Sequence, residues 1–250
     1  MAIQEVLSTG YDTAWVVVSF LVSACGAFAA LSAATLVREG RRGVNWVNAG
    51  FAGLALGGVS IWSMHFIGMM AWETGVAVGY QLFGTLLSLV VAVLASGFAL
   101  GYMAMERFSY RRLAVAGPAA GLGVSAMHFM GMASMGFNGY LTWNWAIVAL
   151  AVLIAVVAAT AALWLAFHIR RTSHRVGAAL VMACAVCTMH YTGMAAADVV
   201  CTTTNRFARL PGLLYGDDFR ALVMLVALGA AVFVAVDAFV QRVMNRRPAA

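Results

Sequence analysis

Charged side chains are scarce in this sequence, making up 10% of the 250 residues against 64% hydrophobic ones. A water-soluble globule of this size could not cover its surface with so few charges, which excludes a soluble protein. Only three prolines are present, which excludes a proline-rich disordered chain, and the apolar excess excludes a disordered chain solvated by its charges. The composition therefore predicts an integral membrane protein.

Lysine is absent, and all 15 basic residues are arginine. The net charge of +6 would suit a nucleic-acid-binding protein, but the arginines come in short clusters between apolar runs. This distribution sets the orientation of membrane spans, so we expect membrane lipid and no nucleic acid as a partner. The four cysteines form no convincing disulfide framework, and neither a glycine-rich phosphate loop nor a nucleophile–base pattern is present. We therefore expect no enzymatic activity.

Seven apolar runs are long enough to form helices that cross the hydrocarbon core, which takes about 20 residues. They predict an all-α, polytopic membrane protein with seven transmembrane helices. The expected spans are residues 14–37, 47–72, 80–105, 113–136, 143–167, 176–197 and 219–240. The first 13 residues contain no basic side chain, so we expect span one to be retained and not cleaved as a signal peptide.

The arginine clusters predict the orientation of the spans, because twelve of the fifteen follow spans one, three, five and seven. The positive-inside rule places that side in the cytoplasm, with the N-terminus outside and the C-terminus inside. About ten residues follow the last span, too few for a soluble output domain. We expect residues 1–250 to be a single membrane domain that acts through its partners, unless a longer chain was cut here. The twelve arginines are Arg38, Arg41, Arg42, Arg107, Arg111, Arg112, Arg170, Arg171, Arg175, Arg242, Arg246 and Arg247.

One six-residue pattern occurs three times: residues 64–69 read MHFIGM, residues 127–132 read MHFMGM and residues 189–194 read MHYTGM. The histidines are 63 and then 62 residues apart, and each period contains two spans. The copies therefore fall in spans two, four and six, which run in the same direction, and predict a threefold repeat of helix pairs. At a rise of 1.5 Å per residue, each histidine lies about 20 to 27 Å from the cytoplasmic face, near the outer one.

In each copy the histidine and the methionine four residues later lie one turn apart on the same helix face. The glycine three residues after the histidine and a small residue seven before it indicate that these faces pack closely together. The methionine just before each histidine points about 100° away and is a weaker ligand candidate, and Cys187 lies within about 60° of His190. The predicted metal ligands are His65, Met69, His128, Met132, His190 and Met194, with Met64, Met127, Met189 and Cys187 as additional candidates.

A structural explanation exists for any single copy of the pattern. A histidine within a span can be a buried polar residue bonded to a neighbouring helix, and methionine is a common core filler. Duplication alone would also repeat the pattern. Three ionisable residues at one level inside a membrane are nevertheless expensive, and they mark a functional site.

The donor set favours copper. An apolar setting disfavours the charged imidazolium and leaves neutral imidazole, the form that binds metals. Soft thioethers beside imidazole favour copper, especially copper(I), whereas structural zinc sites use thiolate, imidazole or carboxylate, and calcium and magnesium prefer oxygen. Such a site leaves room for redox change or a small diatomic ligand. Two alternatives stay open: haem held between histidines, and a copper or proton transport path, which needs a continuous polar pathway.

The third copy, Met189-His190-Tyr191-Thr192, resembles the signature of the MHYT domain, a bacterial integral-membrane sensor family; the first two copies carry phenylalanine in place of tyrosine. The resemblance covers almost the whole chain. It implies a multi-pass protein of the bacterial inner membrane that binds copper through these histidines and methionines and senses oxygen, carbon monoxide or nitric oxide. Many relatives join this domain to cyclase, phosphodiesterase, kinase or DNA-binding modules. This sequence shows none of these modules, so a separate signalling protein is expected as partner.

Overall fold

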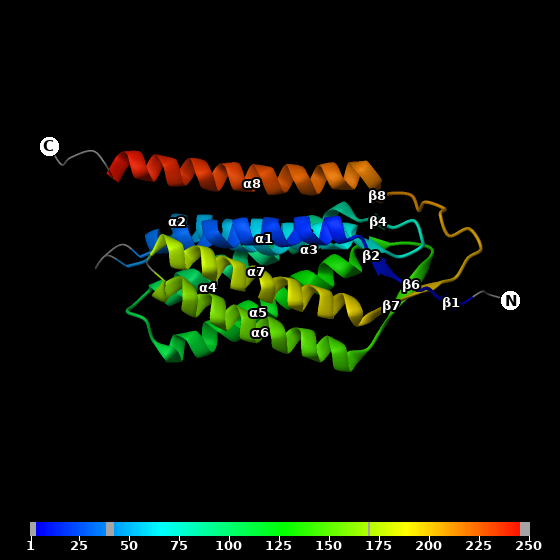
Figure 1. Cartoon of the computed structure of the whole chain (residues 1–250), viewed down its shortest axis with the longest axis horizontal. Helices are drawn as coiled ribbons and strands as arrows, with labels where there is room; N and C mark the ends of the chain where they lie inside the picture. The colour runs from blue at the N-terminus through cyan, green and yellow to red at the C-terminus, as the bar shows by residue number, and fades with distance from the viewer. Residues whose placement is uncertain (1–3, 39–42, 170, 246–250) are drawn as a thin grey trace.

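The computed structural model describes residues 4–38, 43–169 and 171–245 as a bundle of long helices with short strands at one end (Figure 1). Seven helices in these ranges are long and apolar enough to cross a membrane, which confirms the predicted fold class. The spans are α1 with η1 (Thr13–Ala33, Ala34–Leu36), α2 with η2 and α3 (Trp46–Gly53, Leu54–Ser63, Met64–Met70), α4 (Leu82–Ala104), α5 (Tyr110–Ala133), α6 (Trp145–His168), α7 (Thr172–Ala195) and α8 (Gly216–Asn245).

The sequence analysis did not predict the strands. In the described part of the chain they form three antiparallel sheets, ordered β1-β7-β6, β2-β3 and β5-β4-β8. They lie at the end of the bundle that carries the N-terminus, here named the strand end, whereas α8 finishes at the opposite end (Figure 1). The strands are β1 (Glu5–Val6), β2 (Gly10–Tyr11), β3 (Trp72–Glu73), β4 (Gly79–Tyr80), β5 (Met135–Gly136), β6 (Gly139–Trp143), β7 (Ala197–Cys201) and β8 (Leu214–Tyr215).

Each helix pair is closed by its own pair of strands. β2 precedes α1 and pairs with β3, which follows α3; β4 and β5 enclose α4 and α5 in the same way, and β6 and β7 enclose α6 and α7. In every pair the residue before the first helix donates its N–H to the carbonyl of the residue that follows the second helix. These bonds, 2.8–2.9 Å long, join Asp12 to Ala71, Gln81 to Ser134 and Asn144 to Ala196. The predicted threefold repeat is therefore a strand–helix–helix–strand unit.

These clamps set the level of the motif histidines. In all three repeats the clamped carbonyl belongs to the residue six positions after the histidine. Because the three second helices end at equivalent bonds, their histidines are held at equivalent distances from the strand end.

Span two contains one more residue before its histidine than the other two histidine spans. The N-cap of α2 lies 20 residues before His65, whereas the N-caps of α5 and α7 lie 19 residues before His128 and His190. Within span two, η2 is a π-helix, whose wider turns accommodate an extra residue. His65 therefore keeps the same level as its two equivalents despite the longer span.

Span two lies at the centre of the bundle and is the most buried of the seven. Its neighbours approach it closely because the contact points are glycines. A Cβ on Gly57 of η2 would lie 2.2 Å from the carbonyl oxygen of Ala92 in α4, and one on Gly26 of α1 would lie 2.4 Å from the backbone nitrogen of Ser60. Such contacts bring transmembrane backbones together and fix the position of the central span.

We expect Gly57→Ala to lower the free energy of unfolding by about 1–3 kcal/mol, because the α4 backbone must move to admit the new methyl group. Gly50→Ala in the same span is the matched control, since nothing lies within 4 Å of its added Cβ. Thermal unfolding of the purified protein in detergent, followed by far-UV circular dichroism, should show a lower midpoint for Gly57→Ala alone. Equal midpoints for the two variants would contradict the close packing of η2 on α4.

Candidate metal centre

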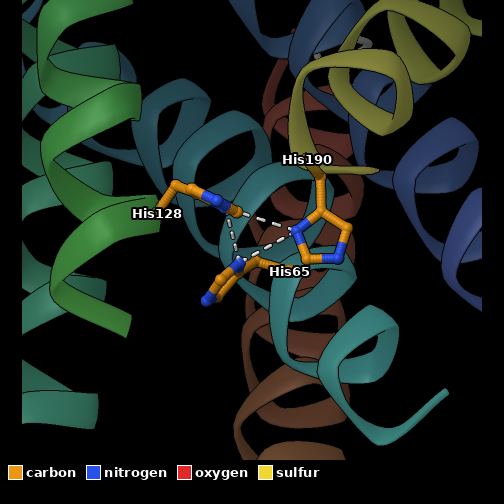
Figure 2. Close-up of side chains that lie close together, drawn as sticks. All are labelled: His65, His128 and His190. Atoms are coloured by element: carbon orange, nitrogen blue, oxygen red, sulfur yellow. Dashed lines mark hydrogen bonds between the residues drawn. The ribbon is translucent and has the colours of Figure 1, made fainter. Parts of the chain in front are cut away.

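Three histidines from three parallel spans meet in the interior of the bundle. His65 of α3, His128 of α5 and His190 of α7 are each 1% exposed. Their Nδ1 atoms point toward one another and lie 3.0, 3.1 and 3.3 Å apart (Figure 2). Among the described residues, the histidine, cysteine and acidic groups placed to hold a metal ion together are these three.

The three Nδ1 atoms cannot satisfy one another by hydrogen bonds alone. A neutral imidazole nitrogen carries either a proton or a lone pair, so among three mutually close nitrogens at least one contact joins two donors or two acceptors. The Nε2 atoms do not resolve this conflict, because all three are buried with no hydrogen-bond partner in the described chain. A buried polar group left unpaired costs about 1–3 kcal/mol. A cation placed between three Nδ1 lone pairs removes the repulsion among them.

The nitrogen spacing also fits a metal ion. In a tetrahedral site with bonds of about 2.0 Å, two ligand nitrogens lie about 3.3 Å apart. The observed 3.0–3.3 Å is close to this separation. Three imidazoles would then occupy three corners of the tetrahedron and leave the fourth for another ligand. Imidazole binds zinc, copper, iron and nickel, so the geometry fits a transition metal without selecting one.

The glycine of each motif makes room for the histidine of another motif. A Cβ added to any of these glycines would lie far too close to an imidazole nitrogen: 2.2 Å from His65 Nε2 at Gly131, 2.3 Å from His128 Nε2 at Gly193 and 2.4 Å from His190 Nε2 at Gly68. We name Gly68, Gly131 and Gly193 the glycine seats. The seating contacts run from α3 to α5, from α5 to α7 and from α7 back to α3, and so form a closed ring. The sequence analysis assigned these glycines to helix packing and missed that each one accommodates a particular imidazole.

The motif methionines are buried next to the histidines. Met69, Met132 and Met194 are at most 3% exposed, and each lies about one helical turn from its histidine, toward the strand end. The methionines that precede the histidines are equally buried: Met64, Met127 and Met189 are at most 2% exposed. The binding of a metal by any of these thioethers stays a prediction.

Cys187 lies at the seam between α1 and α7. It is half-buried and lines a surface groove there together with Val16, Phe20 and Tyr191. Its thiol does not belong to the group of metal-binding side chains formed by the three histidines. Its role as an additional ligand stays a prediction.

The residue after each histidine differs among the copies, and its surroundings explain the difference. The hydroxyl of Tyr191 lies 3.2 Å from Ser19 Oγ of α1, and its ring packs edge-on against Tyr11. Phe66 and Phe129 pack edge-on against aromatic rings. Tyrosine therefore occurs where a hydroxyl partner is present. Sequence reasoning missed Ser19, because a lone serine within an apolar span belongs to no recognisable pattern.

Aromatic rings cover the His65 side of the centre. Phe66 lies edge-on to His65, with 4.6 Å between ring centroids, and contacts Tyr80 and Phe219, which stack on each other at 3.8 Å. Burial raises the pKa of Tyr80 well above its usual value, so its hydroxyl stays protonated at neutral pH. This cluster joins β4 and α8 to the histidine helix and keeps water away from His65.

Comparisons with known proteins bear on the same repeats. The profile of the MHYT family, described as "bacterial signalling protein N terminal repeat", matches residues 58–116 and 121–179. These two matches contain the first and second motifs. No solved structure matches the chain.

Several curated relatives are signalling proteins. The bifunctional diguanylate cyclase/cyclic di-GMP phosphodiesterase MucR of Pseudomonas aeruginosa is 40% identical over 199 residues, which cover 77% of this chain and 29% of MucR. An uncharacterized signaling protein of Caulobacter vibrioides is 37% identical over 198 residues, 78% of this chain and 24% of the relative. The cyclic di-GMP phosphodiesterase NbdA of Pseudomonas aeruginosa is 35% identical over 195 residues, 74% of this chain and 24% of NbdA.

The chain thus spans between 24% and 29% of the length of these relatives. Its seven candidate spans and its relatives make it a multi-pass protein of the inner membrane with a sensor and signalling role. The resemblance noted in the sequence is confirmed: the chain belongs to the MHYT family.

Proposed function

We propose that this protein is a membrane sensor that binds copper through His65, His128 and His190 and responds to redox state or to a diatomic gas. The observation that carries the proposal is the triangle of buried Nδ1 atoms, 3.0–3.3 Å apart, which need a cation between them. The three imidazoles would hold the ion, and the glycine seats would keep them oriented. Copper would supply a redox-active centre with an open ligand position.

The choice of copper rests on the methionines. Met69, Met132 and Met194 surround the triad with buried thioethers, and soft thioether ligands select copper(I) over zinc. Either a thioether or a gas molecule would take the fourth position.

Two observations argue against the alternative functions. A haem needs space for its macrocycle between its ligands, and three imidazole nitrogens within 3.3 Å of one another leave none. A transport path needs polar groups on both sides of the triad, but the space between the triad and the opposite end is lined by apolar side chains, with Ser96 as the exception.

Copper analysis of the purified wild-type protein tests the proposal. We expect one copper(I) per chain, bound tightly enough to compete with a coloured copper(I) chelator, and an X-ray absorption spectrum with nitrogen ligation. Stoichiometric zinc with no retained copper, or no stoichiometric metal at all, would reject the proposed cofactor.

Replacing Met69, Met132 and Met194 together by leucine is expected to lower the affinity for copper(I) about 10–100-fold while the affinity for zinc changes little. Leucine conserves the side-chain volume, so the fold should tolerate the change. Chelator competition measures both affinities, and Met224→Leu on exposed α8 is the control. An equal effect on zinc and copper would show that the thioethers do not select the metal.

For the output we propose that the chain catalyses no reaction itself and passes its signal at the opposite end, which the arginine clusters place in the cytoplasm. The names of MucR and NbdA favour a partner activity that makes or degrades cyclic di-GMP. Cellular cyclic di-GMP, compared between strains with the wild-type protein and with His128→Ala, checks this. Identical levels under copper limitation and copper supply would exclude cyclic di-GMP as the output.

A further inference from the structure

A small cavity lies beneath the imidazole layer, on the side away from the strand end. Its volume is about 50 Å³, and it is bounded by η2, α4, α5, α6 and α7. Ile61, Val124 and Val186 line it, and each lies four residues before the histidine of its own span. About one helical turn, 5.4 Å, therefore separates this apolar layer from the histidines. Met189, next to His190, lines the cavity as well.

The cavity exists because α6 presents alanines where larger side chains would fill the space. Ala155, Ala158, Ala159 and Ala162 line it from this helix. Among the described lining residues, Ser96 alone is polar. A site with so few polar partners does not hold ordered water.

The volume restricts what the cavity can accept. An apolar protein cavity of about 150 Å³ binds benzene or xenon. The present cavity has about one third of that volume, so it excludes ring compounds and suits a molecule of two or three non-hydrogen atoms.

Its accessible side faces the membrane. Ala158 and Ala162 of α6 and Ala185 of α7 are only half-buried, so the seam between these helices is the thin wall of the cavity. At this depth the surroundings are hydrocarbon, and small apolar molecules concentrate there because water disfavours them.

We propose that this cavity is a docking site for a neutral diatomic gas, which enters from the hydrocarbon between α6 and α7 and is held one helical turn from the three histidines. The further step, in which the docked gas reaches the metal, rests on the proposed function. The docking itself does not, because none of the lining residues is a metal ligand candidate other than Met189.

Xenon is the probe, because it is neutral, apolar and visible by anomalous scattering. Crystals of the full chain, pressurised with xenon, are expected to show a xenon atom in the cavity. Ala159→Leu fills the space and should reduce the xenon occupancy at least about tenfold, whereas Ala149→Leu, on the exposed face of the same helix, should leave it unchanged. Val186→Ala enlarges the cavity and should raise the occupancy.

Absence of xenon from both the wild type and Val186→Ala would overturn the docking site, even if Ala159→Leu did not fold. Equal occupancy in Ala159→Leu and the wild type would overturn it too. His65→Ala should retain xenon, so a protein that binds xenon but no copper would separate failure of the metal proposal from failure of the docking site. In copper-loaded protein, carbon monoxide should bind several-fold more slowly to Ala159→Leu than to Ala149→Leu. An unchanged rate would overturn the route from cavity to metal.

Discussion

Replacement of any one of His65, His128 and His190 by alanine is expected to lower the affinity for copper(I) at least about 1000-fold, which corresponds to about 4 kcal/mol of binding free energy. Each variant keeps two of three ligands, and water does not replace the missing one, because the centre is buried beneath aromatic rings. The three variants should lose a similar amount, since the three nitrogens occupy equivalent corners of one site. Competition with a copper(I) chelator measures the loss.

His168→Ala is the control for this series. His168 is an exposed histidine at the opposite end of the bundle, stacked on Trp164, and its removal should change the copper affinity less than about twofold. Copper bound equally well by the wild type and by all three triad variants would place the metal elsewhere. A loss confined to one variant would contradict a shared centre.

Gly193→Ala is expected to weaken copper binding at least about 100-fold, although it removes no ligand. The new Cβ would lie 2.3 Å from His128 Nε2, so the imidazole must shift and its Nδ1 must leave the triangle. A displacement of about 1 Å at a reactive centre typically costs about 100-fold. The backbone itself gains from the change, because alanine is favoured over glycine in a helix by about 1 kcal/mol.

Gly177→Ala in the same helix separates these two effects. Nothing lies within 4 Å of its added Cβ, so it should leave copper affinity unchanged and raise the melting temperature slightly. The same chelator titration, combined with thermal unfolding, compares the two variants. If Gly193→Ala bound copper as well as Gly177→Ala does, the glycine seats would have no role in holding the imidazoles.

The spans and the level of the histidines could be predicted because hydrophobic length and helical rise are properties of the sequence alone. The fourth span, expected at 113–136, runs from Tyr110 to Ala133, an offset of three residues at each end. The strands could not be predicted from pattern, since β4 is only Gly79 and Tyr80, too short for any alternation. Their role follows from backbone bonds between segments far apart in the chain.

At the candidate metal centre, the sequence predicted which side chains meet but not how they are held. Gly131 looked like a packing residue because a small residue in a span is common, and only the coordinates show that His65 lies against it. The extra residue of span two was visible in the unequal histidine spacing, but its absorption by a π-helix depends on the packing of η2 between α1 and α4. The cavity could not be foreseen, since it results from alanines of one helix facing gaps in four other segments.

The closed ring of glycine seats has a consequence for how such a protein evolves. A histidine is accommodated by the next repeat and not by its own, so a mutation in one copy must be compensated in another. Covariation is therefore expected between positions 65 and 66 residues apart, as for His128 with Gly193 and His65 with Gly131. An ancestor with two copies would have left one imidazole unaccommodated, which makes three copies the smallest number that completes the centre.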